Sequence, residues 1–154
     1  MRLKDIREES ELKQFTVSKH LGVSRGTYSL WELELDVIPI KRLNDFCNLF
    51  DCSIDYALGF TNEKNYPNNR KDIDILLSSI RIKEARKAYK KTQEYLANKL
   101  SINRSLISKY EKGHTIISTT FLIECVKLFK ISSDYLLGKI DKKIKINTKF
   151  KENL

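Results

Sequence analysis

The sequence predicts an all-α fold built from two tandem five-helix domains. The main observation is an internal repeat, because the 154-residue chain matches itself without a gap when Arg7 is placed on Arg86, a shift of 79 positions. Such self-similarity indicates one structural unit present twice. The aligned pairs are Arg7 and Arg86, Gln14 and Gln93, Leu21 and Leu100, Arg25 and Arg104, Ser29 and Ser108, and Glu32 and Glu111.

The repeat continues downstream and sets the predicted domain bounds. Leu43, Leu49, Phe50, Ser53 and the run 55–59 coincide in the same frame with Leu122, Leu128, Phe129, Ser132 and the run 134–138, except at Ala57. We therefore expect a first domain over 1–60, a linker over 61–71, a second domain over 72–138 and a basic C-terminal tail over 139–154.

The helices of the second copy follow from periodicity and capping residues. Apolar residues recur at three- and four-residue steps from Ile73 to Ala88, as in an amphipathic helix. Thr92 and Asn103 are suited to begin two short helices separated by a turn at 101–103, and Gly113 is suited to end the second. Two more helices are expected at 121–129 and 132–137, and the copy carries no strand signal.

Two short helices joined by a three-residue turn form the arrangement that places a helix in the DNA major groove. In this arrangement the second copy resembles the Cro/repressor (Xre-type) helix-turn-helix family, through the runs 92–97, 102–113 and 131–138. The first copy resembles it more loosely, through Gln14, Leu21, the run 22–25, Trp31, Glu32 and the run 55–59. The resemblance implies lambda-repressor-like domains over 3–59 and 82–138.

The function implied by this resemblance is a sequence-specific DNA-binding transcriptional regulator, with a repressor as the first interpretation. The helix 103–111, and in second place the helix 24–32, would enter the major groove of double-stranded DNA. The alternative is a protein-interaction or antitoxin-type module in which the first copy binds a protein. We expect no enzyme and no cofactor, because the chain lacks a Ser-His-Asp set, paired carboxylates, a metal cluster and a phosphate-binding glycine loop.

The resemblance assigns DNA contact to matched positions in both copies. At Gln93 a phosphate contact, favoured by the helix N-terminus, competes with a plain exposed polar residue. Arg104 is suited to pair with a guanine edge, and Lys109 to reach a base or a phosphate. The predicted contact residues are Gln93, Asn103, Arg104, Ser105, Ser108 and Lys109 in the second copy, with Gln14, Ser24, Arg25 and Thr27 in the first.

The first copy departs from the pattern where DNA contact would occur. Leu30 replaces Lys109, Gly26 replaces Ser105, and the loop 33–36 is apolar and acidic. Glycine lowers the stability of a helix, and carboxylates repel phosphates. We therefore expect the first copy to bind DNA more weakly than the second. Leu30, Leu33 and Leu35 would form a partner surface if exposed, or would otherwise pack under the following loop.

The resemblance also implies two structural features. In the family, a partly buried ion pair joins the first and third helices, which here means Arg7 with Glu32 and Arg86 with Glu111. We also expect these helices to bury a set of apolar and aromatic residues, namely Leu21, Tyr28, Trp31, Leu100, Ile107 and Tyr110.

The distribution of charge and the cysteine content indicate the kind of partner and the cellular compartment. The net charge is +9, divided as −2 over 1–60, 0 over 61–78, +7 over 79–138 and +4 over the tail, so basic charge is concentrated in the second half. The three cysteines are expected to be buried and free of metal. We expect a cytoplasmic protein, with a homodimer left open and with neither a membrane nor a small-molecule ligand as partner.

The linker and the tail allow several arrangements. Extended, the 12 residues 60–71 would span at most about 40 Å, enough to let both third helices reach one face of DNA. The tail alternates lysine with Ile140, Ile144, Ile146 and Phe150. It would form a helix or strand at an interface, a basic arm along DNA, or an unstructured segment.

Overall fold

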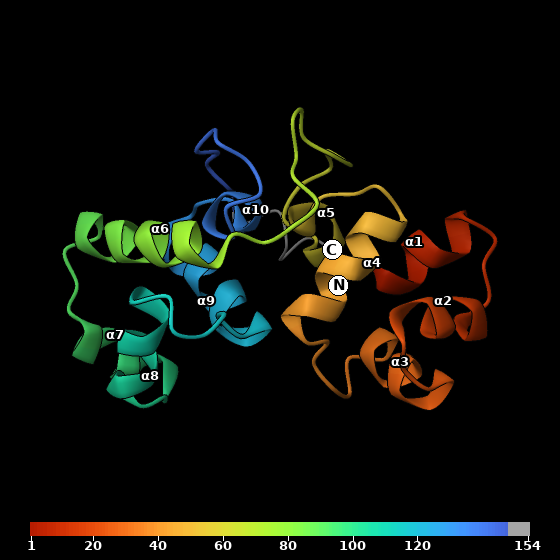
Figure 1. The fold of residues 1–154 in the computed structure, drawn as a ribbon, viewed down its shortest axis with the longest axis horizontal. Coiled ribbons are helices and arrows are strands. Elements are labelled where there is room, and N and C mark those ends of the chain that lie inside the picture. Colours follow the sequence, from red (N-terminus) through yellow and green to blue (C-terminus); the bar gives the residue numbers. More distant parts are fainter. Residues whose placement is uncertain (148–154) are drawn as a thin grey trace. The chain divides into compact units, whose positions relative to one another are not determined.

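The computed structural model describes residues 1–147, and these residues contain ten helices. They divide into two compact units, Met1–Asn69 and the residues from Arg70 onward, which we call unit 1 and unit 2. Helices α1–α5 lie in unit 1 and α6–α10 in unit 2 (Figure 1). None of the helices within 1–147 has the length and apolarity that crossing a membrane requires.

Unit 1 is a bundle of five short helices. Its second and third helices are packed against each other across the turn at 22–24. Ser24 and Ser53 begin two of the helices, because each side-chain oxygen accepts a hydrogen bond from the backbone three residues on. The helices are α1 Leu3–Glu9, α2 Gln14–Leu21, α3 Arg25–Glu32, α4 Ile40–Leu49 and α5 Ile54–Leu58.

Unit 2 has the same order of helices with one extension. Its α7 and α8 begin and end at the positions that the 79-residue shift assigns to α2 and α3. Helix α6 has 14 residues against 7 in α1, so the predicted helix is present and starts at Ile75. Its predicted apolar stripe is not the buried side, because Leu76 and Ile80 are exposed whereas Arg81 and Arg86 are buried. The helices are α6 Ile75–Ala88, α7 Gln93–Leu100, α8 Arg104–Glu111, α9 Thr119–Phe129 and α10 Ser133–Leu136.

The expected caps of unit 2 are present. The Thr92 hydroxyl accepts a hydrogen bond from the Tyr95 backbone at 3.1 Å, and the Asn103 side chain accepts one from the Ser105 backbone at 2.9 Å. Each bond satisfies a backbone donor that the first turn of a helix leaves unpaired. These two caps fix the residues at which α7 and α8 begin.

Both interiors contain the predicted apolar residues, with one exception. Leu21, Tyr28, Trp31, Ile107 and Tyr110 are all buried. The prediction was wrong for Leu100, which is only half-buried. This residue ends α7 and lines a hollow of about 280 Å³ that also borders Leu106 and Phe121, so its side chain keeps contact with solvent.

Part of the segment predicted as a linker is hydrogen-bonded to the two units. Ser53 donates its backbone N–H to Lys64 O at 2.7 Å, and the buried Tyr66 donates its hydroxyl to Asp55 at 2.8 Å, both within unit 1. At the other end, Arg70 donates its backbone N–H to Lys139 O at 2.8 Å within unit 2. The stretch without such contacts to either body is therefore much shorter than 12 residues.

The first part of the tail adds a short pairing to unit 2. Ile131 and Lys145 form an isolated antiparallel bridge, and Ile146 donates its backbone N–H to Lys130 O at 2.9 Å. Ile140 and Ile146 are buried, so two of the tail's apolar residues belong to the core of the unit. Phe150 lies outside the described residues, and with it the rest of the tail from 148 on.

Candidate nucleic-acid interface

Helices α7 and α8 of unit 2 form a helix-turn-helix through the turn 101–103. Ser101 takes the left-handed backbone conformation there, with φ 53°, at the position where unit 1 has Gly22 with φ 71°. This conformation costs a non-glycine residue roughly 1 to 2 kcal/mol. The turn is therefore formed in both units, but in unit 2 it is held against a local conformational cost.

One side of α8 carries polar side chains that face solvent. Arg104, Ser105 and Lys109 are exposed together with Asn103, and Ser108 is half-buried. Ile107 and Tyr110, on the opposite side, are 0% and 5% exposed. No hydrogen bond or ion pair from residues 1–147 reaches the side chains of Arg104 and Lys109. The helix thus presents two unpaired cations outward.

Two of the predicted contact residues are engaged in capping. The Asn103 oxygen accepts hydrogen bonds from both the backbone N–H of Ser105, at 2.9 Å, and its hydroxyl, at 3.0 Å. The hydroxyl of Ser105 is therefore directed back toward the cap. Asn103 keeps its amide N–H groups for an external acceptor, since only its oxygen is used by these bonds.

A bidentate ion pair fixes α8 to α6. Arg86 donates to both carboxylate oxygens of Glu111, at 2.9 and 2.8 Å, and its third hydrogen bond goes to Lys91 O at 2.8 Å. Both side chains are buried, with 11% and 3% exposed. The expected ion pair is confirmed. It joins the last residue of α8 to α6, the first helix of the unit.

Unit 1 contains the matching pair. Arg7 donates to the two oxygens of Glu32 at 2.6 and 3.1 Å and to Leu12 O at 2.9 Å. Burial acts to raise the pKa of Glu32, but hydrogen bonds from Arg7 and Gln14 outweigh it and hold the pKa below its ordinary value. The carboxylate is thus kept ionised at the end of α3.

The two equivalent glutamines have different surroundings. Gln14 donates its side-chain amide to Glu32 at 2.9 Å, inside unit 1. Gln93 is half-buried at the first position of α7, and no hydrogen bond from the described part of the chain reaches its side chain. Because a helix N-terminus favours an anion, the free amide of Gln93 is available to a phosphate, whereas that of Gln14 is used internally.

The other predicted contact residues of unit 1 lie at the start of α3. Ser24 and Arg25 are exposed, and Thr27 is half-buried. Ser24 accepts a hydrogen bond from the Thr27 backbone at 3.1 Å and donates its hydroxyl to the Thr27 side chain at 3.0 Å. Arg25 is the charged member of this set, and no described residue forms a hydrogen bond or ion pair with its guanidinium.

Farther along, the surface of α3 is apolar. Four side chains are well exposed: Leu30 at 42%, Leu33 at 63%, Leu35 at 73% and Val37 at 48%. Of the two arrangements that the sequence left open for the leucines, the exposed one is present. The equivalent positions in unit 2 hold Lys109, Lys112, His114 and Ile116.

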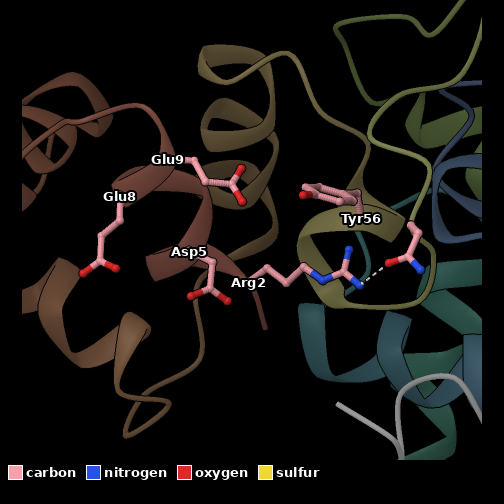
Figure 2. A pocket seen from close by; sticks show the side chains of 6 residues that line it. Arg2, Asp5, Glu8, Glu9 and Tyr56 are labelled. Atoms are coloured by element: carbon pink, nitrogen blue, oxygen red, sulfur yellow. Dashed lines mark hydrogen bonds between the residues drawn. The ribbon is translucent and has the colours of Figure 1, made fainter.

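A hollow of unit 1 has an acidic lining. It measures about 490 Å³ and borders Asp5, Glu8 and Glu9. Figure 2 shows these carboxylates along α1, with Arg2 reaching toward Tyr56. The Arg2 guanidinium lies 4.6 Å from the centre of the Tyr56 ring and donates to Thr61 O and to Asn62. Three carboxylates make this hollow unsuited to a phosphate backbone.

Two further residues that could meet a phosphate lie in the loop after α8 and were not predicted from the sequence. Lys112 and His114 are exposed on either side of Gly113, whose φ is 72°. The signal that could have identified them is their position directly behind the recognition helix, where unit 1 carries Leu33 and Leu35.

Residues 1–147 contain no group of three His, Cys, Asp or Glu side chains that could hold a metal ion. All three cysteines are buried, as predicted, and burial raises the pKa of the Cys125 thiol.

Comparison with known proteins supports the interpretation of unit 2 as a helix-turn-helix domain. Residues 82–136 match the helix-turn-helix family model. The chain is similar to three proteins of Bacillus subtilis (strain 168). The first is the HTH-type transcriptional regulator ImmR, 41% identical over 59 residues, which are 38% of this chain and 46% of ImmR.

The other two relatives are named uncharacterized HTH-type transcriptional regulators. YobD is 28% identical over 76 residues, which are 49% of this chain and 68% of YobD. YqaE is 33% identical over 72 residues, 46% of this chain and 62% of YqaE. The chain thus spans about half to two thirds of the length of these relatives, and all three are named as transcriptional regulators. No solved structure matches the chain significantly.

Proposed function

We propose that this chain is a transcriptional regulator that binds double-stranded DNA sequence-specifically through α8 of unit 2. The observation that carries the proposal is the pair of exposed, unpaired cations Arg104 and Lys109 on a helix whose far end is fixed by the buried Arg86–Glu111 pair. A rigid helix with outward donors is what direct reading of base edges requires.

The roles follow from the chemistry of each group. Arg104, the first residue of α8, has the fork geometry for the O6 and N7 atoms of a guanine. Lys109, Ser108 and Ser105 line the same side of the helix, and Gln93 and Asn103 offer amide donors to phosphates. Lys112 and His114 extend this surface, which lies in the part of the chain with the largest basic excess.

Unit 1 is, on this proposal, a divergent tandem copy of the same domain. The common helix bounds and the equivalent ion pair Arg7–Glu32 support the duplication. Its contact set of Gln14, Ser24, Arg25 and Thr27 makes a minor contribution to DNA binding, because Gln14 is bonded to Glu32, Ser24 is bonded to Thr27, and Arg25 is the only cation of the set.

Regulation by repression requires only occupancy of a promoter by unit 2. The second candidate function is a protein-interaction or antitoxin-type module in which unit 1 binds a protein. The exposed Leu33 and Leu35 support that role for unit 1, and it is compatible with DNA binding by unit 2.

The test is selection of DNA fragments by the full chain from a genomic library that includes the region upstream of its own gene. The proposal expects enrichment of one sequence class, and a footprint on it. Recovery of fragments at background level, from a chain with a helical circular dichroism spectrum, would overturn it. The matched variants are Arg104→Ala, expected to weaken the enrichment and to remove its preference at one base pair, and Arg25→Ala, expected to weaken it only slightly and to leave every base preference in place.

A further inference from the structure

The exposed face of α3 in unit 1 combines an apolar patch with a glycine that the fold does not require. A Cβ on Gly26 would meet only the Ser24 hydroxyl, at 3.9 Å, and the φ of this glycine is not positive. Alanine or a larger residue would therefore fit. Glycine inside a helix weakens it, so its presence at an open surface position has no explanation within unit 1.

Gly26, Leu30 and Leu33 follow one another at four- and three-residue spacing. This spacing places them on one side of the helix. All three are exposed, and Leu35 and Val37 continue the apolar surface beyond the end of α3. We call these five residues the α3 seam. A position without a side chain, beside projecting leucines, allows the backbone of a second helix to approach closely.

The charges at the two ends of the α3 seam are opposite. Arg25, at the start of α3, is exposed and receives no hydrogen bond or ion pair from the described residues. Glu34 and Asp36, just past its end, are exposed carboxylates, and Glu34 pairs with the N-terminal ammonium group at 2.7 Å. A helix that is positive at one end and negative at the other is complementary to an antiparallel copy of itself.

We infer that the α3 seam is the contact between two copies of this chain, with their α3 helices antiparallel about Leu30. In this pairing Gly26 of one copy faces the Leu33–Leu35 end of the other, and Arg25 faces Asp36. The interface is isologous, so each contact is made twice. In unit 2 this side of the third helix carries Arg104 and Lys109 and binds DNA. In unit 1 the equivalent side of α3 binds a second copy of the chain.

The pairing would couple two unit 2 domains in one particle. A dimer presents two α8 helices, and the second binds at the effective concentration set by the chain that joins them, of millimolar order for short flexible linkage. The inference therefore predicts that disruption of the α3 seam weakens binding to a two-site operator far more than binding to a single site.

The experiment is measurement of the mass of the full chain by light scattering and sedimentation over a wide concentration range, without DNA. The inference expects the 18.1 kDa chain to dimerise, Leu33→Glu to raise the dimer dissociation constant at least tenfold, and Leu76→Glu, at another exposed leucine, to leave it unchanged. Gly26→Gln should also weaken the dimer while leaving the helical spectrum intact.

Charge reversal identifies the occupant. Arg25→Glu alone should weaken the dimer, and Arg25→Glu together with Asp36→Arg should restore it, because only an antiparallel self-pairing brings these two positions together. A chain that stays monomeric throughout overturns the inference. So does a dimer that is lost in Leu76→Glu, insensitive to Leu33→Glu, or not restored by the double reversal. None of these outcomes bears on whether unit 2 binds DNA.

Discussion

The side-chain amide of Gln14 lies 2.9 Å from the carboxylate of Glu32, which also accepts two hydrogen bonds from Arg7. In unit 2, Glu111 is bound by Arg86 through both oxygens, and no such bond from Gln93 is present among residues 1–147. The two equivalent glutamines thus have different roles. Gln14 stabilises the interior of unit 1, and Gln93 is left available to a partner.

This difference predicts opposite effects of two matched variants. Gln14→Ala should lower the free energy of unfolding of unit 1 by about 1 kcal/mol, the usual worth of one hydrogen bond, and leave DNA affinity nearly unchanged. Gln93→Ala should weaken DNA binding and leave stability unchanged. Urea unfolding and fluorescence polarisation on the same preparations measure both. A loss of affinity confined to Gln14→Ala would reverse the assignment of the two units.

The buried ion pairs predict large and separable losses of stability. Removing one partner leaves a buried charge without compensation, at a cost of about 3 to 5 kcal/mol. The chain has one tryptophan, Trp31, which is buried in unit 1 and reports on that unit alone. Arg7→Ala should therefore shift the urea midpoint of Trp31 fluorescence. Arg86→Ala should shift only the circular dichroism transition, and a shift of Trp31 fluorescence in this variant would contradict the account.

The lowered pKa of Glu32 predicts a defined pH dependence for unit 1. The folded state binds its proton less readily than the unfolded chain, whose Glu pKa is about 4.3, so stability rises with pH through this region. The contribution is fully present above the unfolded pKa and is lost as pH falls through the folded one. Urea titrations followed by Trp31 fluorescence should show this loss on acidification in the wild type. The loss should be smaller in Glu32→Gln, and equal slopes in the two proteins would argue against it.

Two glycine variants should have opposite signs. Gly26→Ala should stabilise unit 1 by about 0.5 to 1 kcal/mol, since the added methyl group meets open space. Gly138→Ala should destabilise unit 2, because φ is 75° there and the new Cβ would lie 2.8 Å from the Asp74 Cβ. Both are measured by urea unfolding at low protein concentration, in the Leu33→Glu background so that self-association does not contribute. Destabilisation by Gly26→Ala there would show that unit 1 itself needs the glycine.

Much of this architecture can be predicted from the sequence because it depends on local signals. Thr92 and Asn103 cap helices by bonds to residues two or three positions away, and Arg86 and Glu111 are placed by the repeat frame. Contacts that depend on tertiary packing were missed. The burial of Tyr66 rests on its bond to Asp55, and the internal bond of Gln14 rests on how Glu32 lies beside it, neither of which a residue pattern specifies.

The central claim is that Arg104 reads a base. Its most direct test is the affinity of wild type and Arg104→Ala for the selected DNA site and for its single-base variants, at fixed salt. The account predicts that the substitution costs about 1 to 3 kcal/mol on the selected site and removes discrimination at one base pair only. Equal weakening on every sequence, or unchanged affinity, would contradict it.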